Sequence, residues 1–284
     1  MTPFSLNIRG RLVEYDERPL VMGIVNFTPD SYFAGSRAFG TDDEIARRVA
    51  SMMEEGADML DVGGYSTRPG CEDISPEEEA RRLEHGLRIL RREAGPDIPV
   101  SVDTFRADIA RLAVSEWGAD IVNDISGGAL DPGMFRTVAE MHVPYILMHM
   151  RGTPQTMTGL CDYSEGVVAG VLAELAKAAG DAALEGVADI ILDPGFGGFS
   201  KTLAQNWELM ENLDTLRVLR RPLLVGVSRK SMITKGLGIS TDEALNATCA
   251  LHAFALDRGA DILRVHDVRA ARQAVEMYSL LKSR

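Results

Sequence analysis

The chain has 284 residues, of which 45% are hydrophobic, and its formal net charge is −12 at pH 7. This length suits one domain over residues 1–284, and the acidic balance argues against nucleic acid, whose phosphates require a basic surface. The apolar runs stay far below the roughly 18 residues of a membrane span and the N-terminus lacks a signal-peptide pattern, so we expect a cytoplasmic protein without membrane contact.

Strand patterns run through the whole chain. Residues 4–14 alternate weakly between apolar and polar side chains around Gly10, which predicts a β-hairpin. Eight continuous apolar runs follow, and such runs are typical of strands buried on both faces in a parallel sheet. Each run is closed by polar or charged residues, in order Asn26, Asp61, Asp103, Asn123 with Asp124, His149, Asp193, Ser228, and Arg264 with His266.

Helical patterns separate these runs. They begin near Thr41, Ser75, Arg106, Pro132, Glu165, Thr202, Thr241 and Val268. The second opens with SPEE, a capping-box pattern in which Ser75 faces Glu78. Strand then helix, eight times over, predicts an α/β protein, a (β/α)8 TIM barrel whose lower end is closed by the N-terminal β-hairpin. In such barrels the functional residues gather at the C-terminal ends of the strands.

Two carboxylates and an amide are expected deep in the barrel mouth, from Asp103, Asn123 and Asp193. A buried carboxylate needs donors, and fused heterocycles of the guanine or pterin type offer adjacent N–H and amino donors to one carboxylate. Lys230 could donate to the same ring. A structural interpretation stays open for each aspartate alone, because Asp103 could cap the third helix and Asp193 could cap a turn at its Asp–Pro step.

Cations also gather at these strand ends, although the chain is acidic. Arg68, Lys230, Arg264 and His266 indicate a local anion site. The planar guanidinium of Arg264 suits a diphosphate, with a structural salt bridge as the alternative. His149 could orient a neighbour, and the other histidines show no metal-ligand spacing.

Residues 193–202, DPGFGGFSKT, approach the pattern of a phosphate-binding P-loop. Ser200 stands where the second glycine of that pattern belongs, and no second acidic strand pairs with the segment. We therefore expect its glycines to let the chain turn sharply and to leave Phe199 free to wall a pocket.

Taken together, these segments resemble the dihydropteroate synthases. The matches are GIVNFTPDS (23–31), DVGGYSTRPG (61–70), SVDT (101–104), VNDISG (122–127), LMHMRGTP (147–154), LDPG (192–195), VGVSRKS (225–231) and RVHDV (264–268). They span almost the whole chain in the family's order, and GGxSTRPG with SRKS is a specific pair.

The resemblance implies a homodimeric transferase that uses Mg²⁺ to join 6-hydroxymethyl-7,8-dihydropterin diphosphate to p-aminobenzoate, releases pyrophosphate and is inhibited by sulfonamides. Its implied pterin contacts are Asp103, Asn123, Ile125, Met148, Asp193, Lys230 and Arg264. Its implied diphosphate contacts are Asn26, Arg68, Arg264 and His266, with Asn26 also a Mg²⁺ ligand. Its implied aminobenzoate contacts are Thr67, Pro69, Phe199, Lys230 and Ser231. Among them, Asp103, Asp193, Lys230, Arg264 and His266 are expected to be catalytic, in a dissociative substitution at the pterin methylene carbon.

The chain departs from the family pattern in three places. Ala34 stands where members commonly carry aspartate, Tyr65 where many carry glutamate, and the loop after the sixth run is one residue longer at Gly197 or Gly198. Two other functions stay open. A pterin-barrel methyltransferase would share the pterin carboxylates without needing the anion set, and a non-catalytic pterin-binding paralogue is kept open by Ala34.

Overall fold

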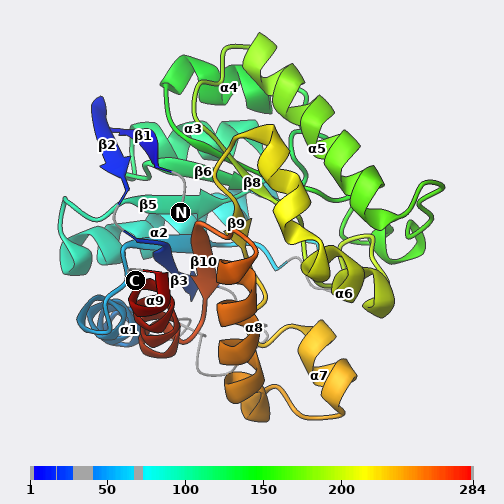
Figure 1. Cartoon of the computed structure of the whole chain (residues 1–284). Coiled ribbons are helices and arrows are strands. Elements are labelled where there is room, and N and C mark those ends of the chain that lie inside the picture. The colour runs from blue at the N-terminus through cyan, green and yellow to red at the C-terminus, as the bar shows by residue number, and fades with distance from the viewer. Residues whose placement is uncertain (1–2, 17, 28–40, 67–72, 283–284) are drawn as a thin grey trace.

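A computed structural model describes residues 3–16, 18–27, 41–66 and 73–282, and within them eight parallel strands form a barrel (Figure 1). The strands are β3 (Leu20–Asn26), β4 (Met59–Gly63), β5 (Val100–Asp103), β6 (Ile121–Asp124), β7 (Tyr145–Met148), β8 (Ile190–Asp193), β9 (Leu224–Val225) and β10 (Ile262–Val265). β10 returns to pair with β3, and one bridge between Leu192 and Leu223 joins β8 to the start of β9. The predicted (β/α)8 barrel is confirmed.

Helices fill the connections between successive strands. They are α1 (Asp42–Glu54), α2 (Pro76–Ala94), α3 (Ala107–Ser115), α4 (Met134–Met141), α5 (Val167–Leu184), α6 (Leu203–Glu211), α7 (Ser231–Leu237), α8 (Leu245–Asp257) and α9 (Val268–Lys282). Short 3-10 turns cover Met157–Gly159, Leu213–Leu219 and Asp242–Ala244. Within the described ranges, no helix combines the length and the apolar character needed to cross a membrane.

Two details of the helices differ from the sequence prediction. Ser75 accepts the Glu78 N–H at 3.3 Å, but the Glu78 carboxylate binds Arg81 and Arg82, so the reciprocal half of the capping box does not form. The pattern predicted from Thr241 begins as a 3-10 turn before α8, and the short α7 was not predicted because seven residues show too little periodicity.

The hairpin of β1 (Phe4–Ile8) and β2 (Arg11–Tyr15) closes the N-terminal end of the barrel, as predicted. Leu6 and Ile8 are buried with an apolar layer contributed by the barrel strands. That layer consists of Leu20, Met22, Met59, Ile121, Ile146, Ile191, Leu224 and Ile262. The larger part of the core lies outside it, between strands and helices, and holds residues such as Val62, Leu87 and Leu209. Polar residues of the strands, such as Asp103 and Asp193, lie at the opposite, C-terminal end.

Aspartates fix the N-terminal ends of the strands. Asp120 is 1% exposed, accepts the N–H of Val100 on the neighbouring strand at 2.8 Å, and forms ion pairs with Arg9 and Arg91. The same kind of backbone bond joins Asp58 to Val21, Asp189 to Asn7 and Asp261 to Leu223. These four carboxylates connect the starts of β4, β6 and β10 to a neighbouring strand and the start of β8 to the hairpin.

Helix α2 packs against the end of β3 at a glycine. A Cβ at Gly86 would lie 2.1 Å from a ring carbon of Phe27, whose side chain is 2% exposed. Glycine in a helix interior costs about 1 kcal/mol relative to alanine. The glycine at position 86 is therefore explained by the Phe27 ring, which occupies the space of its missing side chain directly after β3.

Candidate active site

A pocket opens at the C-terminal ends of the strands, where the sequence predicts the functional residues. Every described residue predicted to contact a substrate lines it: Asn26, Asp103, Asn123, Ile125, Met148, Asp193, Phe199, Lys230, Ser231, Arg264 and His266. The predictions for Thr67, Arg68 and Pro69, and the departure at Ala34, lie outside the described residues. Tyr65, the second departure, also lines the pocket, with its ring edge-on to Phe105 at 5.1 Å.

Arg264 on β10 is the cation that joins the polar groups of the pocket floor. Its Nε donates to Asp61 Oδ2 at 2.7 Å, and its Nη2 donates to Asp103 Oδ2 at 2.9 Å. Burial by itself lowers the pKa of the guanidinium, but the two carboxylates outweigh it and raise the pKa above its ordinary value. The salt bridge considered as the structural alternative for Arg264 is therefore present, within the pocket itself.

Asp61 on β4 was not predicted as a functional residue. It is fully buried and, besides Arg264, accepts a hydrogen bond from Asn123 Nδ2 at 3.2 Å. One carboxylate thus orients a cation and an amide that both line the pocket. The signal in the sequence was an aspartate inside a continuously buried strand, because such a charge requires a buried partner.

Asp103 on β5 and Asp193 on β8 are carboxylates whose ionised form is costly before a ligand arrives. Burial raises the pKa of Asp103 to about 7, against the opposing effect of Arg264. Burial also raises the pKa of Asp193, and Lys230 opposes that shift. Additional N–H donors would stabilise both carboxylates, so the pair is suited to accept hydrogen bonds from a bound ring.

The structural alternatives for these two aspartates have different outcomes. Asp193 Oδ1 accepts the Gly195 N–H at 2.8 Å, so this residue does form the turn predicted at its Asp–Pro step. Asp103 does not cap α3, because the first N–H of that helix, from Ala107, donates to Asp131 at 2.8 Å.

Lys230 and Phe199 lie next to one another in the pocket wall. Lys230 Nζ donates to the Phe196 carbonyl at 2.8 Å and lies 5.1 Å from the centre of the Phe199 ring. Burial lowers the pKa of Lys230 to about 8, which still leaves most of it charged at pH 7. Phe199 also packs on an apolar cluster that includes Ile125 and Met148. The pocket therefore combines a cation with flat apolar walls.

His266 contributes differently from the sequence prediction, which counted it among the cations. Burial lowers its pKa to about 3, and the nearby Arg264 adds to this effect. The imidazole is therefore neutral at pH 7, with Nδ1 3.2 Å from Ser228 Oγ. It offers hydrogen bonding rather than charge.

Residues 193–202 do not form a P-loop, in agreement with the sequence analysis. Lys201 is 5% exposed and donates to the carbonyls of Gly195 and Phe199 rather than facing the pocket. Gly195 and Gly197 have φ angles of 70° and 107°, which provide the sharp turn that the glycines predict.

The donor set gives a limited fit to a metal ion. Over the described ranges, no group of three or more His, Cys, Asp or Glu side chains could hold one. Asn26, whose side chain carries an amide oxygen, is among the residues that line the pocket. Mg²⁺ commonly binds through one or two protein oxygens together with substrate phosphates. The residues therefore fit a magnesium ion that arrives with a phosphorylated substrate.

The chain is similar in sequence and in fold to known pterin-binding enzymes. The chain matches the family model described as pterin binding enzyme over residues 22–266. It is 43% identical to the dihydropteroate synthase of Synechocystis sp. over 98% of this chain and 96% of that protein. Similar solved structures include dihydropteroate synthase of Xanthomonas albilineans with 4-aminobenzoic acid, at a TM-score of 0.88, 37% identity and 100% of both chains. The Yersinia pestis dihydropteroate synthase with a sulfonamide drug complex has a TM-score of 0.90 and 33% identity, over 99% of this chain and 100% of that one.

Proposed function

The chain belongs to the pterin-binding enzymes and, among them, to the dihydropteroate synthases, and we propose from this premise how its pocket performs the family's reaction. The enzyme joins 6-hydroxymethyl-7,8-dihydropterin diphosphate to p-aminobenzoate and releases pyrophosphate. The observation that carries the proposal is the gathering of two carboxylates, Asp103 and Asp193, with two cations, Lys230 and Arg264, around one pocket.

The pterin ring binds at the pocket floor. Asp103 and Asp193 accept its adjacent N–H and amino donors, which relieves the cost of burying two carboxylates. Asn123 and Arg264 complete the polar edge, and Lys230 donates to the ring carbonyl and nitrogen. Ile125 and Met148 cover the flat faces of the ring, as their packing beside Phe199 supports.

The diphosphate binds toward Arg264, His266, Asn26 and Arg68. Arg264 remains charged throughout, and neutral His266 donates or accepts a hydrogen bond. Asn26 is the residue that would hold Mg²⁺, which supplies positive charge to the departing diphosphate.

The aminobenzoate binds against Phe199, Lys230 and Ser231, and Thr67 and Pro69 are further contacts of this subsite in the proposal. The substitution at the pterin methylene carbon is dissociative: diphosphate leaves first, and Asp193 stabilises the positive charge left on the ring system. The aromatic amine then forms a C–N bond to the methylene carbon in place of the broken C–O bond, and its extra proton passes to water or to the released pyrophosphate. Because this amine is neutral at pH 7, it needs no strong general base.

The same proposal makes the enzyme a cytoplasmic homodimer in which residues 1–284 form one domain. Helices α8 and α9 lie side by side (Figure 1) and expose Phe254, Met277 and Leu281 by 41%, 58% and 68%. This exposed apolar face supports the dimer, because a second copy of the chain would cover it. Sulfonamides, which resemble aminobenzoate, occupy the subsite beside Phe199.

The proposal is tested by mixing purified enzyme, pterin diphosphate, p-aminobenzoate and Mg²⁺ and measuring pyrophosphate. We expect release that depends on both substrates. A non-catalytic pterin-binding protein would bind the pterin in calorimetry without releasing pyrophosphate. A methyltransferase would instead demethylate methyltetrahydrofolate in the presence of a corrinoid acceptor, and either result would overturn the proposal.

A further inference from the structure

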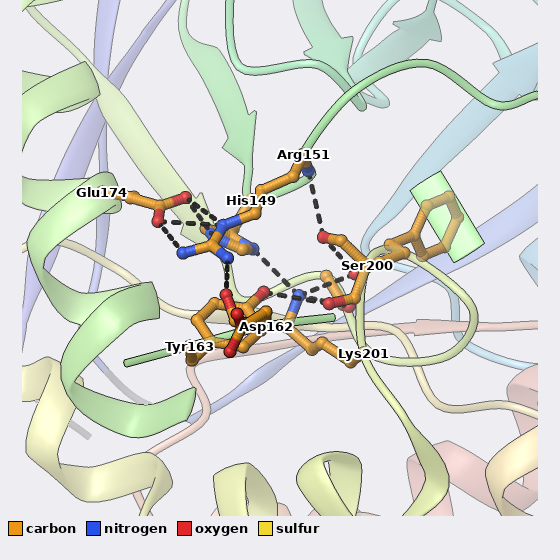
Figure 2. A network of polar contacts seen from close by, with 9 residues as sticks. His149, Arg151, Asp162, Tyr163, Glu174, Ser200 and Lys201 are labelled. Carbon is orange, nitrogen blue, oxygen red and sulfur yellow. Dashed lines mark hydrogen bonds and ion pairs between the residues drawn. The ribbon is translucent and has the colours of Figure 1, made fainter. Parts of the chain in front are cut away.

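Behind the pocket, a buried ammonium group has three acceptors that the proposed reaction does not use. Lys201 Nζ lies 2.9 Å from His149 Nδ1, 3.1 Å from the Gly195 carbonyl and 3.0 Å from the Phe199 carbonyl. Figure 2 shows these contacts converging on the end of the lysine side chain. Three acceptors match the three N–H bonds of a protonated lysine. Burial lowers the pKa of Lys201 to about 7, and the nearby Asp193 carboxylate opposes that shift.

The partners of His149 fix the direction of these hydrogen bonds. His149 Nε2 faces Glu174 Oε2 at 3.0 Å, and a carboxylate can only accept, so the proton of the neutral imidazole lies on Nε2. Nδ1 then carries a lone pair directed at Lys201. Burial lowers the pKa of His149 to about 4, and the Lys201 charge adds to this effect, so the imidazole is neutral at pH 7. Glu174 on α5 thereby favours a donating, protonated Lys201.

The chain next to Lys201 is held in an unfavourable conformation. Ser200 has a φ of 53°, in the left-handed region that non-glycine residues avoid. Its Oγ accepts the Arg151 N–H at 3.0 Å, and its carbonyl accepts the Tyr163 hydroxyl at 3.0 Å. Figure 2 shows Arg151 spanning the network, with its main-chain nitrogen next to Ser200 and its guanidinium at Glu174. Arg151 also donates to Glu174, the carboxylate that accepts from His149, so the loop at Ser200 and Lys201 are held through one shared carboxylate.

The hydrogen bonds of Lys201 connect the two ends of the loop over residues 195–199. Between the two bound carbonyls, Phe196 supplies the carbonyl that accepts from Lys230, and Gly197, Gly198 and Phe199 line the pocket. We propose that Lys201, oriented by His149 and Glu174, is a positioning residue that fixes this loop and thereby sets the Phe199 wall of the aminobenzoate subsite. This inference rests on the proposed role of Phe199 and adds the means by which the ring is placed.

The test is a double-mutant cycle of Lys201→Met and Phe199→Ala, with KM for p-aminobenzoate as its main readout. Losing two loop hydrogen bonds is expected to raise this KM about tenfold in Lys201→Met. Affinity for pterin without diphosphate, measured by calorimetry, is expected to fall by a smaller factor than the aminobenzoate KM rises, because Asp103 and Asn123 lie on strands, whereas Asp193 and Lys230 hydrogen-bond to the loop. Lys177→Met, at an exposed lysine of α5, is the matched control and leaves both quantities unchanged.

If Lys201 acts through Phe199, adding Lys201→Met to Phe199→Ala changes KM by less than about twofold. Effects that multiply, or a Lys201→Met variant with normal KM beside an impaired Phe199→Ala, would overturn the inference while leaving the proposed subsite intact. A normal KM in Phe199→Ala would instead reject the proposed aminobenzoate subsite. Should Lys201→Met not fold, Glu174→Gln perturbs the same hydrogen-bond series, Glu174–His149–Lys201, at its partly exposed end. We expect it to raise the aminobenzoate KM about threefold, and no rise would also overturn the inference.

Discussion

The two ends of the barrel use the same side chains for different purposes. Asp58 and Asp61 stand three positions apart on one strand segment, the first at its N-terminal end and the second facing the pocket floor. Asp261 and Arg264 have the same relation on β10. At the lower end the aspartates bind backbone N–H groups and arginines, whereas at the upper end charged groups surround an open pocket. Whether an aspartate stabilises the fold or serves the active site therefore depends on its position along the strand and not on its residue type.

A shifted pKa does not distinguish the two ends. Burial raises the pKa of Asp58 at the lower end, just as it raises that of Asp193 at the upper end. Asp58 has all of its donors within the protein, namely the Val21 N–H, Arg18 and Arg272. Asp193 lines the pocket, where a ligand can supply further donors. Access for a ligand is therefore the property that marks the functional carboxylate.

The largest expected effect is at the upper end. Asp193→Asn removes the charge that stabilises the pterin during diphosphate departure, while the amide oxygen still accepts the Gly195 N–H. We expect kcat to fall roughly 10³-fold, in the range seen when a key electrostatic group is removed. Thermal unfolding should show no loss of stability. A variant with normal turnover would remove Asp193 from the mechanism.

Asp120→Ala tests the lower end. It leaves Arg9 and Arg91 without their buried carboxylate and the Val100 N–H without its acceptor. We expect the free energy of unfolding in urea to fall by about 3 kcal/mol. The kcat per folded molecule should be unchanged at 20 °C, and a large fall in kcat with intact stability would contradict the division between the two ends.

Arg264→Ala examines a residue that belongs to both categories, because it lines the pocket and also forms ion pairs. We expect affinity for pterin diphosphate to fall about tenfold more than affinity for the pterin without diphosphate, since charge-assisted bonds to phosphate are lost. Calorimetry with both ligands measures the difference. Equal losses would make Arg264 structural only.

The smallest effect concerns the pH dependence of stability. The pKa of Asp103 is about 7 in the folded protein, so between pH 4 and 7 the folded state binds more protons than the unfolded state. The titration of Asp103 therefore lowers the free energy of unfolding of the unmodified protein as pH rises through that window. The Asp103→Asn variant lacks this contribution. We expect stability of Asp103→Asn relative to the parent to increase by on the order of 1 kcal/mol between pH 5 and 7. A flat difference in urea unfolding would refute this, and Asp108→Asn on the exposed face of α3 is the matched control.

The architecture was predictable because each strand carries its own signal. The runs that end at Asp103, Asn123 and Asp193 are apolar throughout and stop at a polar residue, so both the barrel and the gathering of their ends follow from local pattern. Helix α7 lacks such a signal because it is too short to repeat an apolar face.

The connections between the site residues were not predictable, because they depend on groups far apart in the chain. Asp61 on β4 meets Arg264 on β10 past the intervening strand β3, and the neutral state of His266 follows from its burial. Two of the acceptors of Lys201 are close to it in sequence, but His149 lies on another strand end and meets it only in the folded chain. Sequence pattern indicates which residues reach the pocket, and packing decides their charge and orientation.

Gly86 connects the packing of α2, outside the strands, to the end of β3 at the active site. Gly86→Ala would strengthen α2 by propensity, yet its methyl group would occupy the seat of Phe27, the residue that follows Asn26. A position on helix α2 thereby contacts the residue next to Asn26, which lines the pocket. Helix propensity favours alanine at this position and packing against the end of β3 requires glycine, so packing decides the residue.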